Sequence, residues 1–469
     1  MKRLFRRKIL THILEELDIE QHRLHRALNA FDLTVLGIGA IIGVGIFVLT
    51  GVAAANYAGP GVILSFVVSG LACAFAGLCY AELASSIPVA GSAYNYAYAT
   101  MGEMVAWIIG WDLILEYIVA CIAVAIGWSG YFVRIMAVIG IEIPVWCSAA
   151  PGTKPGALIN LPAIFITLFL TTILIIGIKE SARFTSLMVF IKLLTVLVFI
   201  MVGFSHINPA NWIPFMPFGL KGVVAGAAIV FFAYIGFDAV STAAEETINP
   251  QRNMPIGILL SLGFCTILYI IVAAVLTGMV SYKSLNTPAP VADALTLVGF
   301  HWGSAIVSAG AVAGITSVLL VMLMGQPRIF FSMSRDGLLW PWISKVHPRF
   351  RTPYISQTLT GIVVAGFAGF IPIGTAAELC NIGTLFAFAI VCGGVVVLRQ
   401  THPELRRSFR CPLVPLVPLL GVFSCVCLML TLPHITWVRF VVWLMLGLAI
   451  YFYYGIRHSH LAGRGESGG

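Results

Sequence analysis

Long stretches of apolar residues, separated by short polar segments, follow one another along almost the whole chain. A stretch of about 18 residues or more can cross the hydrocarbon core of a bilayer as a helix. We therefore predict twelve membrane-spanning helices, at residues 32–57, 61–87, 103–125, 158–178, 183–206, 221–242, 254–280, 303–334, 356–373, 376–398, 413–433 and 435–456. The apolar stretch 127–139 is too short to cross a membrane, so we expect it to lie at the outer face.

The composition agrees with a membrane protein and excludes soluble classes. Of the 469 residues, 59% are hydrophobic and only 10% are charged. Soluble domains contain about 45–50% apolar and about 25% charged residues, so a soluble enzyme or a nucleic-acid-binding protein is excluded. We expect the lipid bilayer as a partner and no nucleic acid.

Lysines and arginines are distributed unevenly between the two sides of the membrane. With the N-terminus inside, the loops on that side carry most of the 27 basic residues, as the positive-inside rule requires. We therefore predict a multi-pass protein of the cell inner (plasma) membrane with both termini cytoplasmic. The basic loop Arg399–Arg410 separates the last two spans from a ten-span core. The segment Ile9–Leu28 mixes basic, acidic and apolar residues, which favours an amphipathic helix on the membrane surface.

The first predicted span carries an unusual number of glycines. Four of the nine residues from Gly37 to Gly45 are glycine, and each costs a helix interior roughly 1 kcal/mol relative to alanine. Gly39 and Gly43 form a G-x-x-x-G pattern, which is typical of close helix packing. Alternatively, the helix is unwound near Gly43–Gly45, and its free N–H groups receive an anion at the bilayer midplane.

The sixth predicted span has a similar irregularity, because the aromatic segment Phe231–Tyr234 is followed by Gly236 and Asp238. Interrupted helices at corresponding positions of two five-helix halves are typical of transporters built from inverted repeats. The alternative is that Gly236 only lets a neighbouring helix approach, while Asp238 lies near the cytoplasmic end of the span.

Three ionisable residues lie deep in predicted spans, where a charge costs about 2.5–3.5 kcal/mol and suggests a function. Lys192 lies in the middle of the fifth span, and burial would favour its neutral amine, so it could carry a proton. Alternatively, Lys192 is a permanent structural cation. Asp112 and Glu116 share one face of the third span, and Glu116 is either a wall of a substrate pocket or a structural partner.

No pattern of catalytic or metal-binding residues competes with these features. The spans lack the histidines that a metal site needs, and the chain has no nucleophile elbow or phosphate-binding loop. The ten cysteines form no C-x-x-C pair. Tyr94, Tyr96 and Tyr98 fit an aromatic belt at the membrane interface. We therefore expect no enzymatic activity and no cofactor, with a proton gradient or substrate exchange as the source of energy.

Several motifs, in the same order along the chain, resemble those of an amino acid permease of the amino acid–polyamine–organocation (APC) superfamily. The motifs are Gly37–Phe47, Pro88–Tyr94, Phe231–Asp238, Glu245–Pro250 and Arg328–Gly337. The resemblance covers roughly residues 30–456 and is closest to bacterial relatives of the cationic amino acid transporters.

This resemblance implies an all-α integral membrane protein with the leucine-transporter-like 5+5 inverted repeat and discontinuous helices 1 and 6. The corresponding division of the chain is an N-terminal segment 1–30, a first repeat 31–206, a second repeat 207–398, two additional helices 399–456 and a cytoplasmic tail 457–469.

The resemblance also implies roles for individual residues. The backbone of the unwound first span would bind the substrate α-carboxylate, the carbonyls of the sixth span would bind the α-ammonium group, and two side chains would line the pocket. These residues are, in that order, Ile41, Gly43, Val44 and Gly45; Phe232, Ala233 and Ile235; and Glu116 and Met322. Lys192 matches the lysine of proton-coupled relatives. Val44 departs from the family pattern, because many members carry a serine or threonine hydroxyl there.

Together these features predict a proton-coupled importer of L-amino acids, cationic or small neutral, that works by alternating access. An amino acid exchanger of the same fold is the alternative, and a membrane sensor that does not transport is a remote one. The expected partners are an L-amino acid and the bilayer, with a small single-span membrane subunit as a further candidate.

Overall fold

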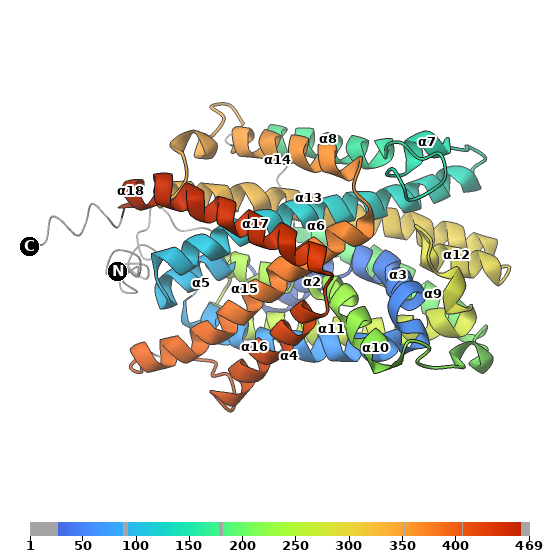
Figure 1. Ribbon diagram of the computed structural model, residues 1–469, viewed down its shortest axis with the longest axis horizontal. Coiled ribbons are helices and arrows are strands. Elements are labelled where there is room, and N and C mark those ends of the chain that lie inside the picture. The colour runs from blue at the N-terminus through green and yellow to red at the C-terminus, as the bar shows by residue number, and fades with distance from the viewer. Residues whose placement is uncertain (1–26, 88–91, 178–181, 351, 406, 461–469) are drawn as a thin grey trace, which may run out of the picture.

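The computed structural model describes residues 27–87, 92–177, 182–350, 352–405 and 407–460 (Figure 1). Within these ranges the regular structure is helical, apart from two isolated β-bridges. The surface helix predicted for Ile9–Leu28 lies almost entirely outside the described residues. So do the first four residues of the motif Pro88–Tyr94 and most of the predicted tail 457–469.

The longer helices follow one another in chain order, joined by short turns. They are α2 (Ala30–Ile41), α4 (Val62–Ser86), α6 (Glu103–Val138), α8 (Leu161–Ile176), α9 (Ala182–Phe204), α10 (Gly219–Val230), α11 (Pro250–Met279), α13 (His301–Arg335), α14 (Tyr354–Ala368), α15 (Ile373–Thr401), α16 (Leu416–Leu430) and α17 (His434–Ile450). Short helices important for the site are the π-helix η2 (Gly45–Leu49), α3 (Thr50–Ala53), α5 (Ser92–Thr100), α12 (Pro290–Leu297), and the 3-10 helices η6 (Phe231–Tyr234) and η7 (Asp238–Glu246).

Helices of membrane-spanning length dominate the chain. Within the described residues, eight helical stretches are long and apolar enough to cross a bilayer, counting the continuous run Gly45–Ser86 as one. The apolar helices α2, α8, α14 and α16 are shorter. The fold is therefore all-helical, as the apolar pattern of the sequence predicted.

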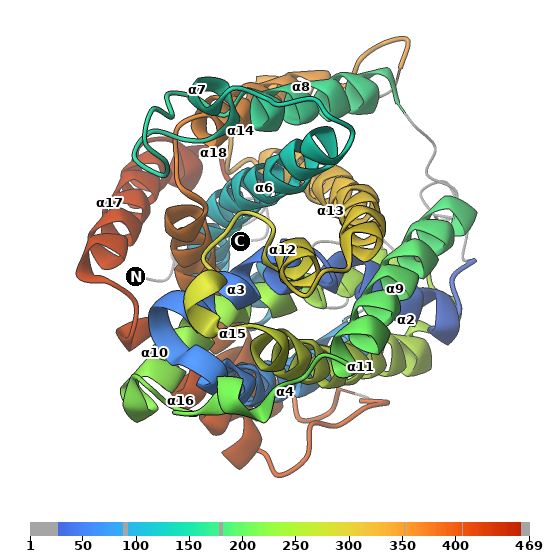
Figure 2. The ribbon, with the colours of Figure 1, turned by 90° about the vertical axis from the view of Figure 1, so that its right-hand side faces the viewer.

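The helices run mainly along the long axis of the molecule, with α5 and α18 (Ile456–His458) at one end and α7 (Val145–Ser148) and α12 at the other (Figure 1). We call these the terminal end and the opposite end. Seen from the opposite end, α6 and α13 lie near the middle, while α8, α9, α16 and α17 lie at the periphery (Figure 2). In its most apolar window α6 is 83% buried, whereas the stretch that contains α17 is 22% buried.

The third predicted span is longer than the sequence suggested. Helix α6 continues without a break to Val138, so the prediction of a separate outer segment at 127–139 is wrong. The extension has packed partners: the Trp128 indole donates a hydrogen bond of 2.8 Å to the Thr316 hydroxyl, and the Tyr131 hydroxyl donates one of 2.7 Å to the Phe47 carbonyl. These contacts stabilise the helix beyond the length that a bilayer requires.

The tyrosines assigned to an interfacial belt are instead buried inside α5. Tyr94, Tyr96 and Tyr98 are each 1% exposed, so this prediction is wrong. The Tyr94 hydroxyl donates a 2.7 Å hydrogen bond to the Asp336 carboxylate. Burial, together with that carboxylate, raises the pKa of Tyr94, so the phenol stays protonated. Helix α5 is thereby tied to the end of α13.

At the opposite end, α12 lies over the start of the transmembrane bundle (Figure 2). A Cβ on Gly51 of α3 would lie 2.5 Å from the ring of Pro290, so α3 and α12 are in close contact. The Arg134 guanidinium of α6 lies 3.2 Å from the Asp293 carboxylate and also donates a 2.6 Å hydrogen bond to Thr296. Both charged side chains are partly exposed.

Candidate binding site at two helix interruptions

The first interruption separates α2 from η2. Helix α2 ends at Ile41, and Ile42 has an extended backbone with φ −74° and ψ 105°. The next helical turns begin around Val44 and Gly45. The first N–H groups of a helix have no partner within that helix, so this interruption leaves backbone donors free.

Side chains occupy the carbonyl groups at the same interruption. The Lys192 ammonium donates a 2.6 Å hydrogen bond to the Gly39 carbonyl, and the Tyr269 hydroxyl donates one of 2.9 Å to the Ile41 carbonyl. With these acceptors occupied, the first interruption presents mainly N–H groups to a ligand.

Lys192 of α9 is fully buried against α13. A Cβ on Gly314 would lie 2.7 Å from the Cγ atom of Lys192, so this glycine makes room for the lysine stem. Among the described residues Lys192 forms no ion pair, and its hydrogen bond goes to the backbone of α2. The amine is thus a single buried group whose protonation state acts directly on the first interruption.

The second interruption separates α10 from η7 in the sixth predicted span. After η6, Ile235 is extended and Gly236 has φ +123°, a conformation that glycine adopts far more easily than other residues. The Asp238 carboxylate accepts a 3.1 Å hydrogen bond from the Gly236 N–H. Here the donor side of the interruption is occupied by an acidic side chain, and the carbonyl side faces the other way.

Polar side chains from two other helices contact the carbonyl side of this interruption. The Asn381 amide of α15 donates hydrogen bonds of 2.6 Å to the Ala228 carbonyl and 3.2 Å to the Ile229 carbonyl. The Tyr269 hydroxyl also lies 3.0 Å from the Ala233 carbonyl. Tyr269 therefore bridges the two interruptions through one hydroxyl group.

The two interruptions pack directly against each other through glycines. A Cβ on Gly45 would overlap the backbone of Ala233, and a Cβ on Gly236 would lie 2.8 Å from the backbone of Ala40. The contact is reciprocal, since each interruption supplies one glycine that abuts the other chain segment. This close approach brings backbone donors of one segment near backbone acceptors of the other.

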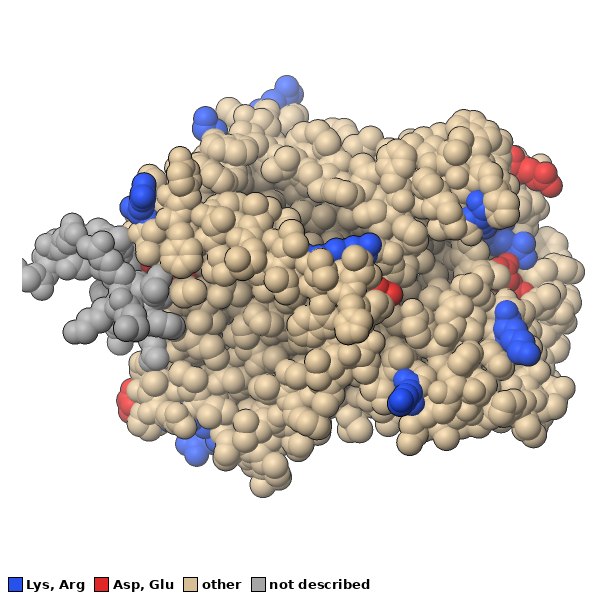
Figure 3. All heavy atoms as spheres, in the orientation of Figure 1, with Lys and Arg blue, Asp and Glu red and all other residues tan. Residues whose placement is uncertain are grey.

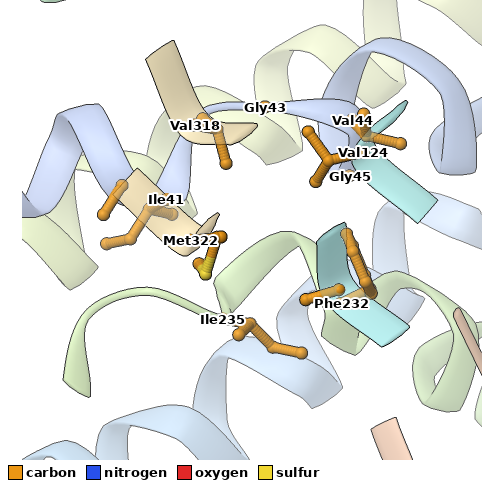
Figure 4. A pocket seen from close by; sticks show the side chains of 11 residues that line it. Ile41, Gly43, Val44, Gly45, Val124, Phe232, Ile235, Val318 and Met322 are labelled. Atoms are coloured by element: carbon orange, nitrogen blue, oxygen red, sulfur yellow. The ribbon is translucent and has the colours of Figure 1, made fainter. Parts of the chain in front are cut away.

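A cavity of about 290 Å³ lies at this junction (Figure 4). Its lining residues come from both interruptions, from α6 and from α13, and all carry apolar side chains or none. They are Ala40, Ile41, Gly43, Val44, Gly45, Ala120, Val124, Phe232, Ile235, Val318 and Met322. Polar recognition in this cavity must therefore come from the backbone, while the side chains select apolar groups.

Residues 28–452 match the family model of the amino acid permeases. The chain belongs to the amino acid permease family. It is a multi-pass membrane transporter of the APC superfamily and not an enzyme. It is 52% identical to the methylthioribose transporter of Bacillus subtilis (strain 168), over 98% of this chain and 100% of that protein.

Two further relatives of this permease carry the names of amino acid transporters. The branched-chain amino acid permease BcaP of Bacillus subtilis (strain 168) is 51% identical, over 97% of this chain and 98% of that protein. Cationic amino acid transporter 4 of Homo sapiens is 31% identical, over 93% of this chain and 88% of that protein.

In the permease, the structure brings most of the residues singled out in the sequence to one cavity. Seven of them line it: Ile41, Gly43, Val44, Gly45, Phe232, Ile235 and Met322. Ala233 lies beside the cavity, where Tyr269 contacts its carbonyl. Glu116 is buried but does not line the cavity; it lies one helical turn from Ala120 along α6.

Sequence reasoning about the permease missed two kinds of residue. Ala120, Val124 and Val318 line the cavity but resemble every other apolar residue of a span. Tyr269 and Asn381 are polar residues within spans, a signal that buried polar groups need partners. The sequence alone does not identify those partners, because they are backbone carbonyls of other helices.

Proposed function

We propose that this permease imports L-amino acids with apolar side chains together with protons. The observation that carries the proposal is the opposite polarity of the two interruptions. Free N–H groups at Gly43–Gly45 suit an α-carboxylate, and carbonyls from Phe232 onward suit an α-ammonium group. A zwitterionic amino acid carries both groups on neighbouring atoms, which matches two interruptions in direct contact.

The cavity lining supports an apolar side chain on the substrate. A cationic side chain would need a carboxylate, and Glu116 is not among the lining residues. A ribose would need partners for its hydroxyl groups, and none of the described lining side chains is polar. The proposal therefore resembles the name of the branched-chain permease more than that of the methylthioribose transporter.

Proton coupling is proposed for Lys192. When charged, its ammonium forms a strong hydrogen bond to the Gly39 carbonyl and holds the end of α2. When neutral, the amine forms a weaker bond and α2 can move. Loss of the proton on the inner side would thus loosen the first interruption and help to release the substrate. No cofactor enters this scheme, because the proton gradient supplies the energy.

The proposed architecture has twelve spans and a 5+5 inverted repeat, with repeats at 31–206 and 207–398 and two additional helices at 399–456. Its support is that the interruptions fall in the first and sixth predicted spans, which are corresponding positions of two five-helix halves. We further propose that the terminal end is cytoplasmic and that the membrane is the plasma membrane. A small single-span subunit is a candidate partner, testable by co-purification.

Uptake into proteoliposomes tests this function. Labelled leucine, valine, methionine, alanine, arginine and methylthioribose are offered to empty vesicles, with and without an inward proton gradient. We expect accumulation of the apolar amino acids only with the gradient, and its loss in the Lys192→Ala variant. Lys221→Ala, which removes an exposed lysine, is the matched control and should behave like the wild type.

Other outcomes of the same assay would overturn parts of the proposal. Uptake that requires amino acid inside the vesicles would establish exchange, with Lys192 as a permanent structural cation. Gradient-driven uptake of methylthioribose or arginine in place of apolar amino acids would overturn the substrate assignment.

A further inference from the structure

One face of α15 contacts the second interruption at two points. Asn381 and Phe388 are seven residues apart, so they lie on the same face of the helix. The Phe388 ring packs against Phe231 before the interruption and Phe237 after it, with ring centroids 5.8 Å and 5.0 Å apart. Helix α15 thus contacts both halves of the broken span, although it supplies none of the cavity lining residues.

The Asn381 side chain is fully buried and makes a specific contact with the end of α10. Because α10 ends at Val230, its last carbonyls lose the N–H partners that a continuing helix would supply. The two N–H groups of the Asn381 amide replace those partners at Ala228 and Ile229. The reverse orientation of the amide would place its oxygen against two carbonyl oxygens, so the contact fixes which way the amide points.

We propose that Asn381 is a positioning residue for substrate binding. By holding the carbonyls of Ala228 and Ile229, it fixes the direction in which α10 ends. The backbone that follows within one turn, from Phe232 to Ile235, supplies the carbonyls that face the cavity and the substrate ammonium. Asn381 acts through this backbone and does not touch the substrate. The uptake readout of this inference rests on the proposed function.

The Asn381→Asp variant tests the inference, because it keeps the shape of the side chain and replaces the donor by an acceptor. We expect its KM to rise about tenfold to hundredfold for every amino acid that the wild type transports, since two buried carbonyls lose their donor. The maximal rate should stay within about threefold of the wild type, because Lys192 and the first interruption are unchanged. Cys392→Ala, elsewhere on α15, is the matched control and should keep the wild-type KM.

A donor series keeps the test decisive if the aspartate variant does not fold. Asn381→Ser retains one hydroxyl donor and Asn381→Ala retains none, so the expected order of KM is wild type, serine, alanine. Equal KM values across this series in folded protein, or a loss of maximal rate at unchanged KM, would overturn the inference.

Hydrogen–deuterium exchange separates this inference from the proposed function, because it needs no substrate. The segment 228–237 should exchange faster in Asn381→Asp than in the wild type, while α6 is unchanged. Unaltered exchange in that segment would overturn the positioning role. A wild type that transports no amino acid would overturn the proposed function, and the exchange measurement would still decide the role of Asn381.

Discussion

The two helix interruptions are alike in geometry but opposite in the groups that they leave free. At the first, Lys192 and Tyr269 occupy carbonyl groups at the end of α2, so N–H groups are left. At the second, the Asp238 carboxylate occupies an N–H group, so carbonyls are left. The identity of the side chain that contacts each interruption therefore decides its polarity.

This difference explains how an apolar cavity can bind a charged molecule. An interrupted helix exposes both donors and acceptors, and by itself has no preference for an anion or a cation. A basic side chain at one interruption and an acidic side chain at the other remove the unwanted half of each set. Recognition of a carboxylate and an ammonium group then needs no charged side chain in the cavity.

The strongest way to break this arrangement is to separate the two interruptions. In Gly45→Ala the new methyl group would overlap the backbone of Ala233, and in Gly236→Ala it would meet Ala40 in a backbone conformation with φ +123°. Backbone atoms cannot move aside as flexible side chains do, so we expect each variant to lose at least about 100-fold in the Vmax/KM of uptake, since small misplacements of a binding site are costly.

Gly263→Ala is the control for these variants. A Cβ on Gly263 of α11 meets nothing within 4 Å, so the same change there should leave uptake unaltered and stabilise the helix slightly. Near-normal uptake in folded Gly45→Ala or Gly236→Ala would show that the two segments need not touch for transport.

A smaller effect is expected from removing the one hydroxyl that serves both interruptions. Tyr269→Phe keeps the ring and leaves the Ile41 and Ala233 carbonyls without their shared donor. A buried acceptor without a partner costs about 1–3 kcal/mol, so we expect KM to rise about 5-fold to 100-fold. Uptake kinetics of the apolar amino acids measure it.

Tyr131→Phe is the comparison, because its hydroxyl bonds one carbonyl, that of Phe47, well beyond the first interruption. We expect a lower melting temperature and a smaller change in KM than in Tyr269→Phe. If the two variants raise KM equally, the shared position of Tyr269 has no special importance for substrate binding.

The sequence predicted the helices and the positions of the interruptions better than the contacts around them. Apolar length located the spans, and the glycines near residue 43 and at Gly236 marked where helices would end. Apolar length could not predict that α6 continues to Val138, because the packing of Trp128 and Tyr131 stabilises that extension. Asn381 is a single polar residue in the sequence, and its importance depends on carbonyls about 150 residues away.

The smallest effect is expected at the opposite end, where only the first broken span is covered by α12. Arg134 pairs with Asp293 across α6 and α12, and the pair is partly exposed, so it contributes no more than about 1 kcal/mol. In Arg134→Gln we expect α12 to open more often toward the outer side. An outward-open form that is more populated lowers the apparent KM for external substrate, by about two- to fivefold. Uptake measured from the outside checks the direction. The exchanged pair Arg134→Asp with Asp293→Arg should return KM toward the wild type, whereas a loss that the exchange does not repair would mean that Arg134 acts through Thr296 alone.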